Sequence, residues 1–185
     1  MITGLFFGTF DPIHVAHFQV AHNLIQYKIV DRVWFVVTPS NPFKQNQIIS
    51  SYDHRIAMVR LAIKNCSYFQ VSDIEAQLDS PQYTANTLRY IKENHPNETF
   101  FIIMGSDNYN NLSTWRDAQF ILNNFKICVY KREQHWKNNS DNHVFQIPGE
   151  YMNISSSLIR KNIFASKDYL NKDVLKYAID HSLYN

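Results

Sequence analysis

Short apolar runs alternate with amphipathic stretches along most of the chain. Runs rich in β-branched and aromatic residues predict buried strands at residues 5–7, 33–37, 69–72, 99–104, 126–130 and 144–147. Stretches in which apolar residues recur at three- and four-residue steps predict helices after Pro12 and at residues 53–64, 84–93, 115–122, 156–163 and 172–181. Because strands alternate with helices, the sequence predicts an α/β sandwich of three layers, with a mainly parallel sheet covered by helices on both faces.

Polar and glycine residues that could carry chemistry follow four of the predicted strands, at Gly8, Thr38, Gly105 and Arg132. Right-handed crossovers bring the carboxyl ends of parallel strands to one edge of the sheet, and ligands bind in the crevice there. We therefore expect these four loops to face one crevice. A chain of 185 residues fits one domain, and we expect the helices of residues 155–185 to pack against its core.

Composition excludes several classes of protein. The chain is 45% hydrophobic and 15% aromatic, which is typical of globular proteins and argues against disorder. A net charge of +2 does not call for a nucleic acid or a membrane as partner, but a mild positive bias suits an anionic substrate. Cys66 and Cys128 are too few for a disulfide framework and lack metal spacing. With so few cysteines we expect a reducing cytoplasm. The N-terminus lacks a cationic leader and no run of about 18 apolar residues occurs, so we expect neither a signal peptide nor a transmembrane helix.

The most informative stretch is residues 3–22, where a strand, a tight turn between Gly8 and Pro12 and a helix follow one another. His14 and His17 lie near the start of that helix. Side chains three residues apart share a helix face and lean toward its N-terminus, where free backbone N–H groups attract anions. We interpret the stretch as a phosphate site. An ordinary strand–turn–helix unit with surface histidines fits the same spacing, whereas zinc is disfavoured because no third ligand stands at metal spacing.

Gly105, Ser106 and Asp107 follow the clearest strand of the chain. Glycine permits close approach of a ligand to the backbone, and a carboxylate there could accept a hydrogen bond from a ribose hydroxyl or hold a metal-bound water. A strand-ending turn in which Asp107 caps the next helix fits the sequence equally well.

Three consecutive serines, Ser155 to Ser157, predict the start of a helix because serine is a favoured N-cap residue. Arg160 lies one turn after Ser156, so that hydroxyls, backbone N–H groups and a guanidinium would converge on one oxyanion. The run alone is explained as well by a capped helix that binds nothing.

Residues 8–17 read Gly-Thr-Phe-Asp-Pro-Ile-His-Val-Ala-His and resemble the Gly-(Ser/Thr)-Phe-(Asp/Asn)-Pro-x-(His/Thr)-x-Gly-His signature of the nucleotidyltransferase superfamily. Within it, nearly the whole chain is most similar to the bacterial nicotinate mononucleotide adenylyltransferase family. Residues 154–160 resemble its Ile-Ser-Ser-(Ser/Thr)-x-(Ile/Leu)-Arg element, which grips the ATP phosphates. Two positions depart from the pattern: Phe7 stands where many members have glycine, and Ala16 replaces the glycine of His-x-Gly-His.

The resemblance implies a Rossmann-like fold and adenylyl transfer from ATP to nicotinate mononucleotide, with ATP carrying Mg²⁺. It implies catalytic roles for His14, His17, Lys44 and Arg160. It implies nucleotide-binding roles for Gly8, Thr9, Phe10, Gly105, Ser106, Asp107, Arg132, Ser155 and Ser156. It implies contacts with the acceptor nucleotide for Tyr83, Thr84 and Trp115. No residue is expected to ligate the metal directly, although Asp107 could do so through a water.

Other functions remain open at this stage. The same chemistry could act on nicotinamide mononucleotide, on phosphopantetheine or on a cytidylyl substrate, and side chains alone do not reveal whether an acid or an amide is preferred. A nucleotide-binding sensor without catalysis is the alternative from another class, and retention of the basic and histidine residues argues against it. Association into a homo-oligomer is not readable from the sequence.

Overall fold

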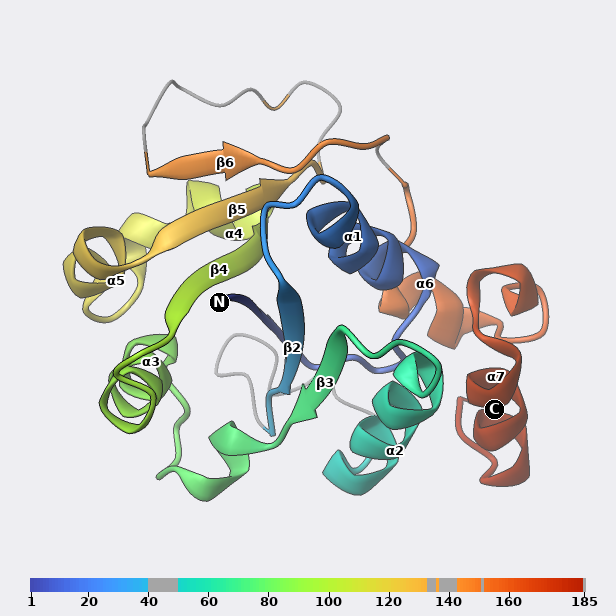
Figure 1. Ribbon diagram of the computed structural model, residues 1–185. Helices are drawn as coiled ribbons and strands as arrows, with labels where there is room; N and C mark the ends of the chain where they lie inside the picture. The colour runs from blue at the N-terminus through green and yellow to red at the C-terminus, as the bar shows by residue number, and fades with distance from the viewer. Residues whose placement is uncertain (40–49, 133–135, 137–142, 151, 185) are drawn as a thin grey trace.

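The computed structural model describes residues 1–39, 50–132, 136, 143–150 and 152–184. Within these residues one sheet of six parallel strands forms the centre of the protein, in the order β3-β2-β1-β4-β5-β6 (Figure 1). The strands are β1 (Ile2–Gly8), β2 (Arg32–Val37), β3 (Phe69–Ser72), β4 (Thr99–Gly105), β5 (Lys126–Tyr130) and β6 (Val144–Gln146). Every strand that the sequence predicted is present, and the sheet is parallel throughout.

Helices cover the sheet on both sides. The α-helices are α1 (Val15–Gln26), α2 (Tyr52–Ile63), α3 (Thr84–Asn94), α4 (Ser106–Asn110), α5 (Ala118–Asn124), α6 (Ser156–Lys161) and α7 (Lys172–Asp180). Short 3₁₀ helices are η1 (Ile74–Gln77), η2 (Leu112–Thr114) and η3 (Lys167–Tyr169). Helices α1, α2, α6 and α7 lie on one face and α3, α4 and α5 on the other (Figure 1). The three-layer α/β fold is therefore confirmed. None of the helices in the described ranges has the length and apolar character needed to cross a membrane.

The central strand shows why the fold has two cores. Successive strand residues point to opposite faces of a sheet. Leu5 accordingly packs with the helices of one face, and Phe6 packs with those of the other. A strand buried on both sides must be apolar without interruption, which is the pattern that predicted it. Ile159 of α6 and Val174 of α7 belong to the same core cluster as Phe6.

Several helix boundaries differ from those predicted. The helix predicted at residues 115–122 is wrong at its start, because Trp115 ends η2 in an extended conformation and Asp117 adopts a left-handed backbone with φ 56°. Helix α5 begins only after that break. His14 is the N-cap residue of α1, and α2 begins at Tyr52, one residue before its predicted start, with Ser51 as its N-cap residue.

The strand order determines where a ligand can approach. The chain leaves β1 toward α1 on one face and leaves β4 toward α4 on the other, although β1 and β4 are neighbours in the sheet. This reversal is a topological switch point, and the loops that diverge from it leave a crevice beyond the carboxyl ends of the strands. The loops after Gly8 and Gly105 border that crevice.

Candidate active site

Two stacked imidazoles lie at the start of α1. The ring centroids of His14 and His17 are 3.8 Å apart, and the backbone N–H of His14 donates to Nδ1 of His17 at 3.3 Å. A neutral His17 therefore carries its proton on Nε2. His14 is only 4% exposed, and within the described residues neither of its ring nitrogens has a hydrogen-bond partner. Because buried polar groups are normally hydrogen-bonded, these two ring nitrogens are candidates for binding a ligand or a water.

The electrostatic setting of His14 keeps its ring uncharged. Burial, together with the positive charge of Arg132, lowers the pKa of His14 from 6.5 to about 3. At neutral pH the imidazole can thus offer one N–H donor and one acceptor, but no charge.

The turn between β1 and α1 is held in one conformation by its own residues and by α2. A Cβ on Gly8 would lie 2.8 Å from the Phe10 ring, so the tight path of the turn requires glycine. Phe10 itself has φ 49°, a left-handed conformation that is costly for an aromatic residue. The buried guanidinium of Arg55 donates to the carbonyl oxygens of Thr9 at 2.9 Å and of Thr38 at 2.7 Å. Arg55 thereby connects the loops after β1 and β2.

The serine-rich motif lies directly against this turn. Ser155 caps α6 through its side chain, and the hydroxyl of Ser156 donates to the carbonyl oxygen of Pro12 at 2.9 Å. The guanidinium of Arg160 donates to the carbonyl oxygen of Asp11 at 2.7 Å. The two motifs are far apart in the sequence and adjacent in space. Arg160 is bound to the turn and is not among the residues that line the pocket.

The Gly105 motif and Arg132 form one unit. Arg132 pairs with Asp107 through Nη1 and Oδ2 at 3.1 Å, and the backbone N–H of Arg132 donates to the Ser106 hydroxyl at 3.0 Å. A Cβ on Gly105 would lie 2.4 Å from Oδ1 of Asp107 and 2.5 Å from Cδ of Arg132. Glycine is therefore needed for the side chains of the loops after β4 and β5 to meet.

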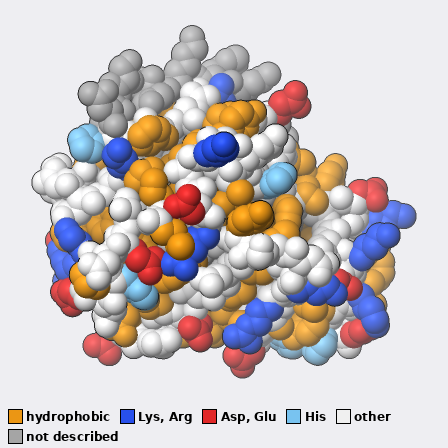
Figure 2. Space-filling model, in the orientation of Figure 1, with side chains coloured by type: hydrophobic (Ala, Val, Ile, Leu, Met, Phe, Trp, Pro, Cys, Tyr) orange, Lys and Arg blue, Asp and Glu red, His pale blue; other side chains and the backbone are white. Residues whose placement is uncertain are grey.

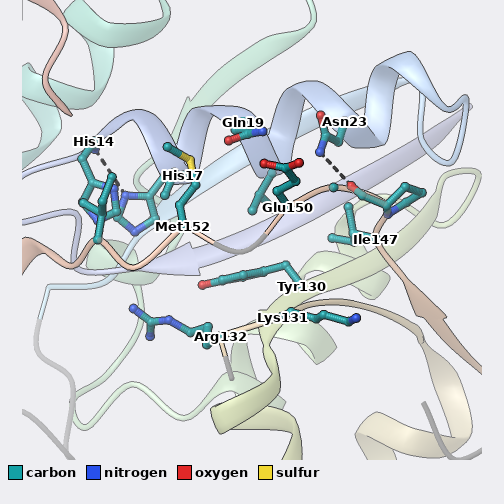
Figure 3. Close-up of a pocket in the computed structure, with 15 residues that line it drawn as sticks. His14, His17, Gln19, Asn23, Tyr130, Lys131, Arg132, Ile147, Glu150 and Met152 are labelled. Carbon is teal, nitrogen blue, oxygen red and sulfur yellow. Dashed lines mark hydrogen bonds between the residues drawn. The ribbon is translucent and has the colours of Figure 1, made fainter. Parts of the chain in front are cut away.

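A pocket lies between α1 and the chain that follows β5 and β6 (Figure 3). Its lining residues are His14, Ala16, His17, Gln19, Val20, Asn23, Tyr130, Lys131, Arg132, Ile147, Pro148, Gly149, Glu150, Met152 and Ile154. Its enclosed volume of about 50 Å³ is well below the 300–1,000 Å³ typical of ligand cavities. The described residues thus form an open groove, with the imidazoles at one end and Lys131 and Arg132 along one side.

Several pocket residues were missed by the sequence interpretation. Gln19 and Asn23 are four residues apart and lie on the same face of α1 as Ala16, so helical spacing from the histidines could have identified them. The side-chain amide of Asn23 donates to the carbonyl oxygen of Pro148 at 2.7 Å, which joins α1 to the segment after β6 (Figure 3). Nothing in the sequence of that segment indicated chemistry.

The residues expected at the acceptor form a separate group that does not line this pocket. Tyr83 is the N-cap residue of α3, and Thr84 is the first residue of that helix. The guanidinium of Arg116 lies over the Tyr83 ring at 4.8 Å, which brings the segment containing Trp115 next to α3. Lys44 lies outside the described residues.

Charge is interspersed on the face in view in Figure 2, where Lys, Arg, Asp and Glu side chains alternate around apolar ones. The local positive charge beside the imidazoles comes from Lys131 and Arg132. The fold, with a groove at the switch point of its sheet, is typical of nucleotide-binding α/β proteins.

Comparison with known proteins gives the family. The cytidylyltransferase-like family model matches residues 5–162. A probable nicotinate-nucleotide adenylyltransferase of Flavobacterium psychrophilum is 38% identical over 98% of this chain and 97% of its own length, and that of Flavobacterium johnsoniae gives the same values. The chain belongs to the cytidylyltransferase-like family, in the group of the nicotinate-nucleotide adenylyltransferases.

A solved structure agrees with the fold. The Plasmodium falciparum nicotinic acid mononucleotide adenylyltransferase complexed with NaAD superposes with a TM-score of 0.85, covering 99% of this chain and 97% of that one at 24% identity.

Proposed function

We propose that the chain transfers the adenylyl group of ATP to nicotinate mononucleotide in NAD biosynthesis. An oxygen of the acceptor phosphate forms a bond to the α-phosphorus of ATP, the bond from that phosphorus to the bridging oxygen breaks, and pyrophosphate leaves with the electron pair. The products are deamido-NAD and pyrophosphate. The relatives named for this activity match the chain over nearly its full length, which supports the proposal.

The observation that carries the chemistry is the pair of imidazoles at the switch point. The acceptor phosphate is already an anionic nucleophile, so catalysis requires orientation and charge stabilisation rather than a general base. We propose that His14, whose ring nitrogens have no partner in the described residues, donates to a phosphate oxygen of ATP. His17 would donate from Nε2, because its Nδ1 already accepts from the backbone.

Positive charge for the leaving pyrophosphate would come from side chains around the groove. Arg132 lines the groove next to His14 and is oriented by Asp107. We propose that Lys44 also contacts the phosphates. The hydrogen bond from Arg160 to the Asp11 carbonyl oxygen supports a role for Arg160 in stabilising the turn that precedes His14.

Magnesium would enter as the complex with ATP. The described residues include no group of three or more His, Cys, Asp or Glu side chains that could hold a metal. Oδ1 of Asp107 is buried and has no hydrogen-bond partner in the described residues, whereas Oδ2 pairs with Arg132. A single available carboxylate oxygen fits an ion that keeps most of its waters. Asp107 would hold one of those waters, and the bound ion would neutralise part of the triphosphate charge.

We further propose that Tyr83, Thr84 and Trp115 form the acceptor site. An aromatic ring stacked on the pyridine would supply about 1 kcal/mol beyond the burial of surface. The adjacency of Tyr83 to the segment of Trp115 supports a shared site. We also propose that the enzyme acts in the cytoplasm.

Pyrophosphate release from ATP tests the function. Separate reactions contain nicotinate mononucleotide, nicotinamide mononucleotide, phosphopantetheine or no acceptor, and the highest kcat/KM is expected with the nicotinate nucleotide. A higher value with any other acceptor would refute the assignment of substrate. ATP binding without pyrophosphate release under all conditions would identify a sensor instead.

The His17→Ala variant tests the site. Its kcat should fall by about 10²-fold or more, since it removes a positioned donor to the reacting phosphates. The exposed His22 on the same helix supplies the control, because His22→Ala should retain the wild-type rate. Near-normal turnover in the His17→Ala protein would refute the proposal that His17 binds the reacting phosphates.

A further inference from the structure

Tyr184, near the C-terminal end of the chain, contacts the turn between β1 and α1. The hydroxyl of Tyr184 donates to Oδ1 of Asp11 at 2.6 Å. Asp11 is 1% exposed and Tyr184 is 9% exposed, so this hydrogen bond is shielded from water. A buried carboxylate is costly unless hydrogen bonds or charges compensate it, and the tyrosine hydroxyl supplies one such hydrogen bond.

Asp11 also connects to α6. Oδ2 of Asp11 lies 3.9 Å from Nη1 of Arg160, and the same guanidinium nitrogen donates to the Asp11 carbonyl oxygen. The Tyr184 hydroxyl additionally lies 3.9 Å from the sulfur of Met58 in α2, and its ring belongs to the core cluster beneath α1 and α2. The C-terminal tyrosine and α6 therefore meet at the Asp11 carboxylate, and α2 contacts the tyrosine hydroxyl through Met58.

The position of His14 depends on this turn. No hydrogen bond to a described residue fixes the His14 ring, so its placement follows from the backbone that precedes it and from packing. That backbone includes Phe10, which is held at φ 49°. A strained conformation persists only when its surroundings impose it. The contacts on Asp11, one residue after Phe10, are among those that do so.

We propose that Tyr184 is a positioning residue for the turn between β1 and α1. Its hydroxyl binds the Asp11 carboxylate and thereby fixes the position of His14 for contact with ATP. The proposal rests on the function proposed above and deepens it. Tyr184 acts through Asp11 and makes no contact with substrate. Removal of its hydroxyl should therefore affect the use of ATP and leave the affinity for the acceptor unchanged.

Kinetics of the Tyr184→Phe variant test the proposal. We expect kcat/KM for ATP to fall by about tenfold or more, because small displacements of a positioned group have effects of this size, while the acceptor KM stays within about twofold. Tyr177→Phe is the matched control, since it removes a second C-terminal tyrosine hydroxyl, whose partner is Nδ1 of His54 at 2.9 Å. The control should retain the wild-type kcat/KM for ATP.

A double-mutant cycle locates the effect. Asp11→Asn keeps an oxygen acceptor for the Tyr184 hydroxyl, whereas Asp11→Ala does not, so the asparagine variant should retain more activity. Adding Tyr184→Phe to Asp11→Ala should cost little further, because the hydrogen bond between the hydroxyl and Asp11 has already been lost. Equal losses in the asparagine and alanine variants, or additive losses in the double variant, would overturn the proposal.

Two further measurements make each outcome decisive. Calorimetric titration of ATP without any acceptor should show weaker binding to Tyr184→Phe than to Tyr177→Phe, and this readout does not depend on which acceptor the enzyme uses. Failure of the proposed substrate would leave that difference in place. Equal ATP affinity of the two variants, a parallel rise of both KM values, or a Tyr184→Phe protein that does not fold would each refute a positioning role.

Discussion

Acidification should destabilise the protein through His14. In the unfolded chain a histidine takes up a proton near pH 6.5, but in the folded protein burial and the charge of Arg132 lower the pKa of His14 to about 3. Between these values the unfolded state binds one more proton than the folded state. The contribution of His14 to stability is therefore complete above pH 6.5 and is lost as the pH falls toward 3.

The magnitude follows from the size of the shift. Each pH unit below 6.5 removes about 1.4 kcal/mol from the free energy of unfolding until the folded imidazole itself takes up a proton. At about pH 5 the loss should reach about 2 kcal/mol, which is a large part of the 5–15 kcal/mol typical of a domain.

Urea denaturation of the wild type and His14→Gln at about pH 7.5 and about pH 5 measures this effect. Glutamine does not titrate, so its variant should lose about 2 kcal/mol less than the wild type between the two conditions. His22→Gln, at an exposed position of the same helix, should behave as the wild type. An equal loss in the wild type and His14→Gln would refute the account of a buried, neutral imidazole.

Two further substitutions test the architecture of the site. Gly105→Ala places a Cβ 2.4 Å from Asp107 Oδ1 and 2.5 Å from Arg132 Cδ, so it should break the ion pair between these two side chains. The KM for ATP, measured by pyrophosphate release, should then rise by about tenfold. An unchanged KM would show that the ion pair does not orient Arg132 for ATP. Arg55→Leu removes the guanidinium that donates to the carbonyl oxygens of Thr9, Thr38 and Pro39. The free energy of unfolding, measured by urea denaturation, should fall by about 3 kcal/mol. A loss under about 1 kcal/mol would contradict the role of Arg55 in connecting the two loops.

The strands could be predicted because their physical requirement is local. A strand buried on both faces must be apolar along its whole length, and residues 33–37 and 99–104 meet that condition without reference to the rest of the chain. The start of α5 could not be read in this way. Asp117 has a left-handed backbone, and aspartate adopts that conformation too seldom for its presence to predict a break.

The site was predictable in its residue types and less so in its contacts. The spacing of His14 and His17 indicated a shared direction, and the structure stacks their rings. The resemblance grouped Arg160 with the two histidines, and its motif lies against the turn that precedes them. Which atom the guanidinium meets depends on how α6 docks, and no local pattern records that. The contact of Tyr184 could not be predicted for the same reason, because its partner Asp11 lies 173 residues earlier in the chain.

The place of β1 at the middle of the sheet has a consequence for how the chain folds. One neighbour of β1, the strand β2, begins 24 residues after it ends, but the other neighbour, β4, begins only at Thr99. Throughout that interval during synthesis the inner edge of β1 has no native partner, and its open N–H and C=O groups can pair with another chain. Long-range parallel pairing is also slow to form. Nascent or refolding molecules should therefore be most prone to association before β4 docks, and the switch point, where we propose that the nucleotide binds, is completed by that same late event.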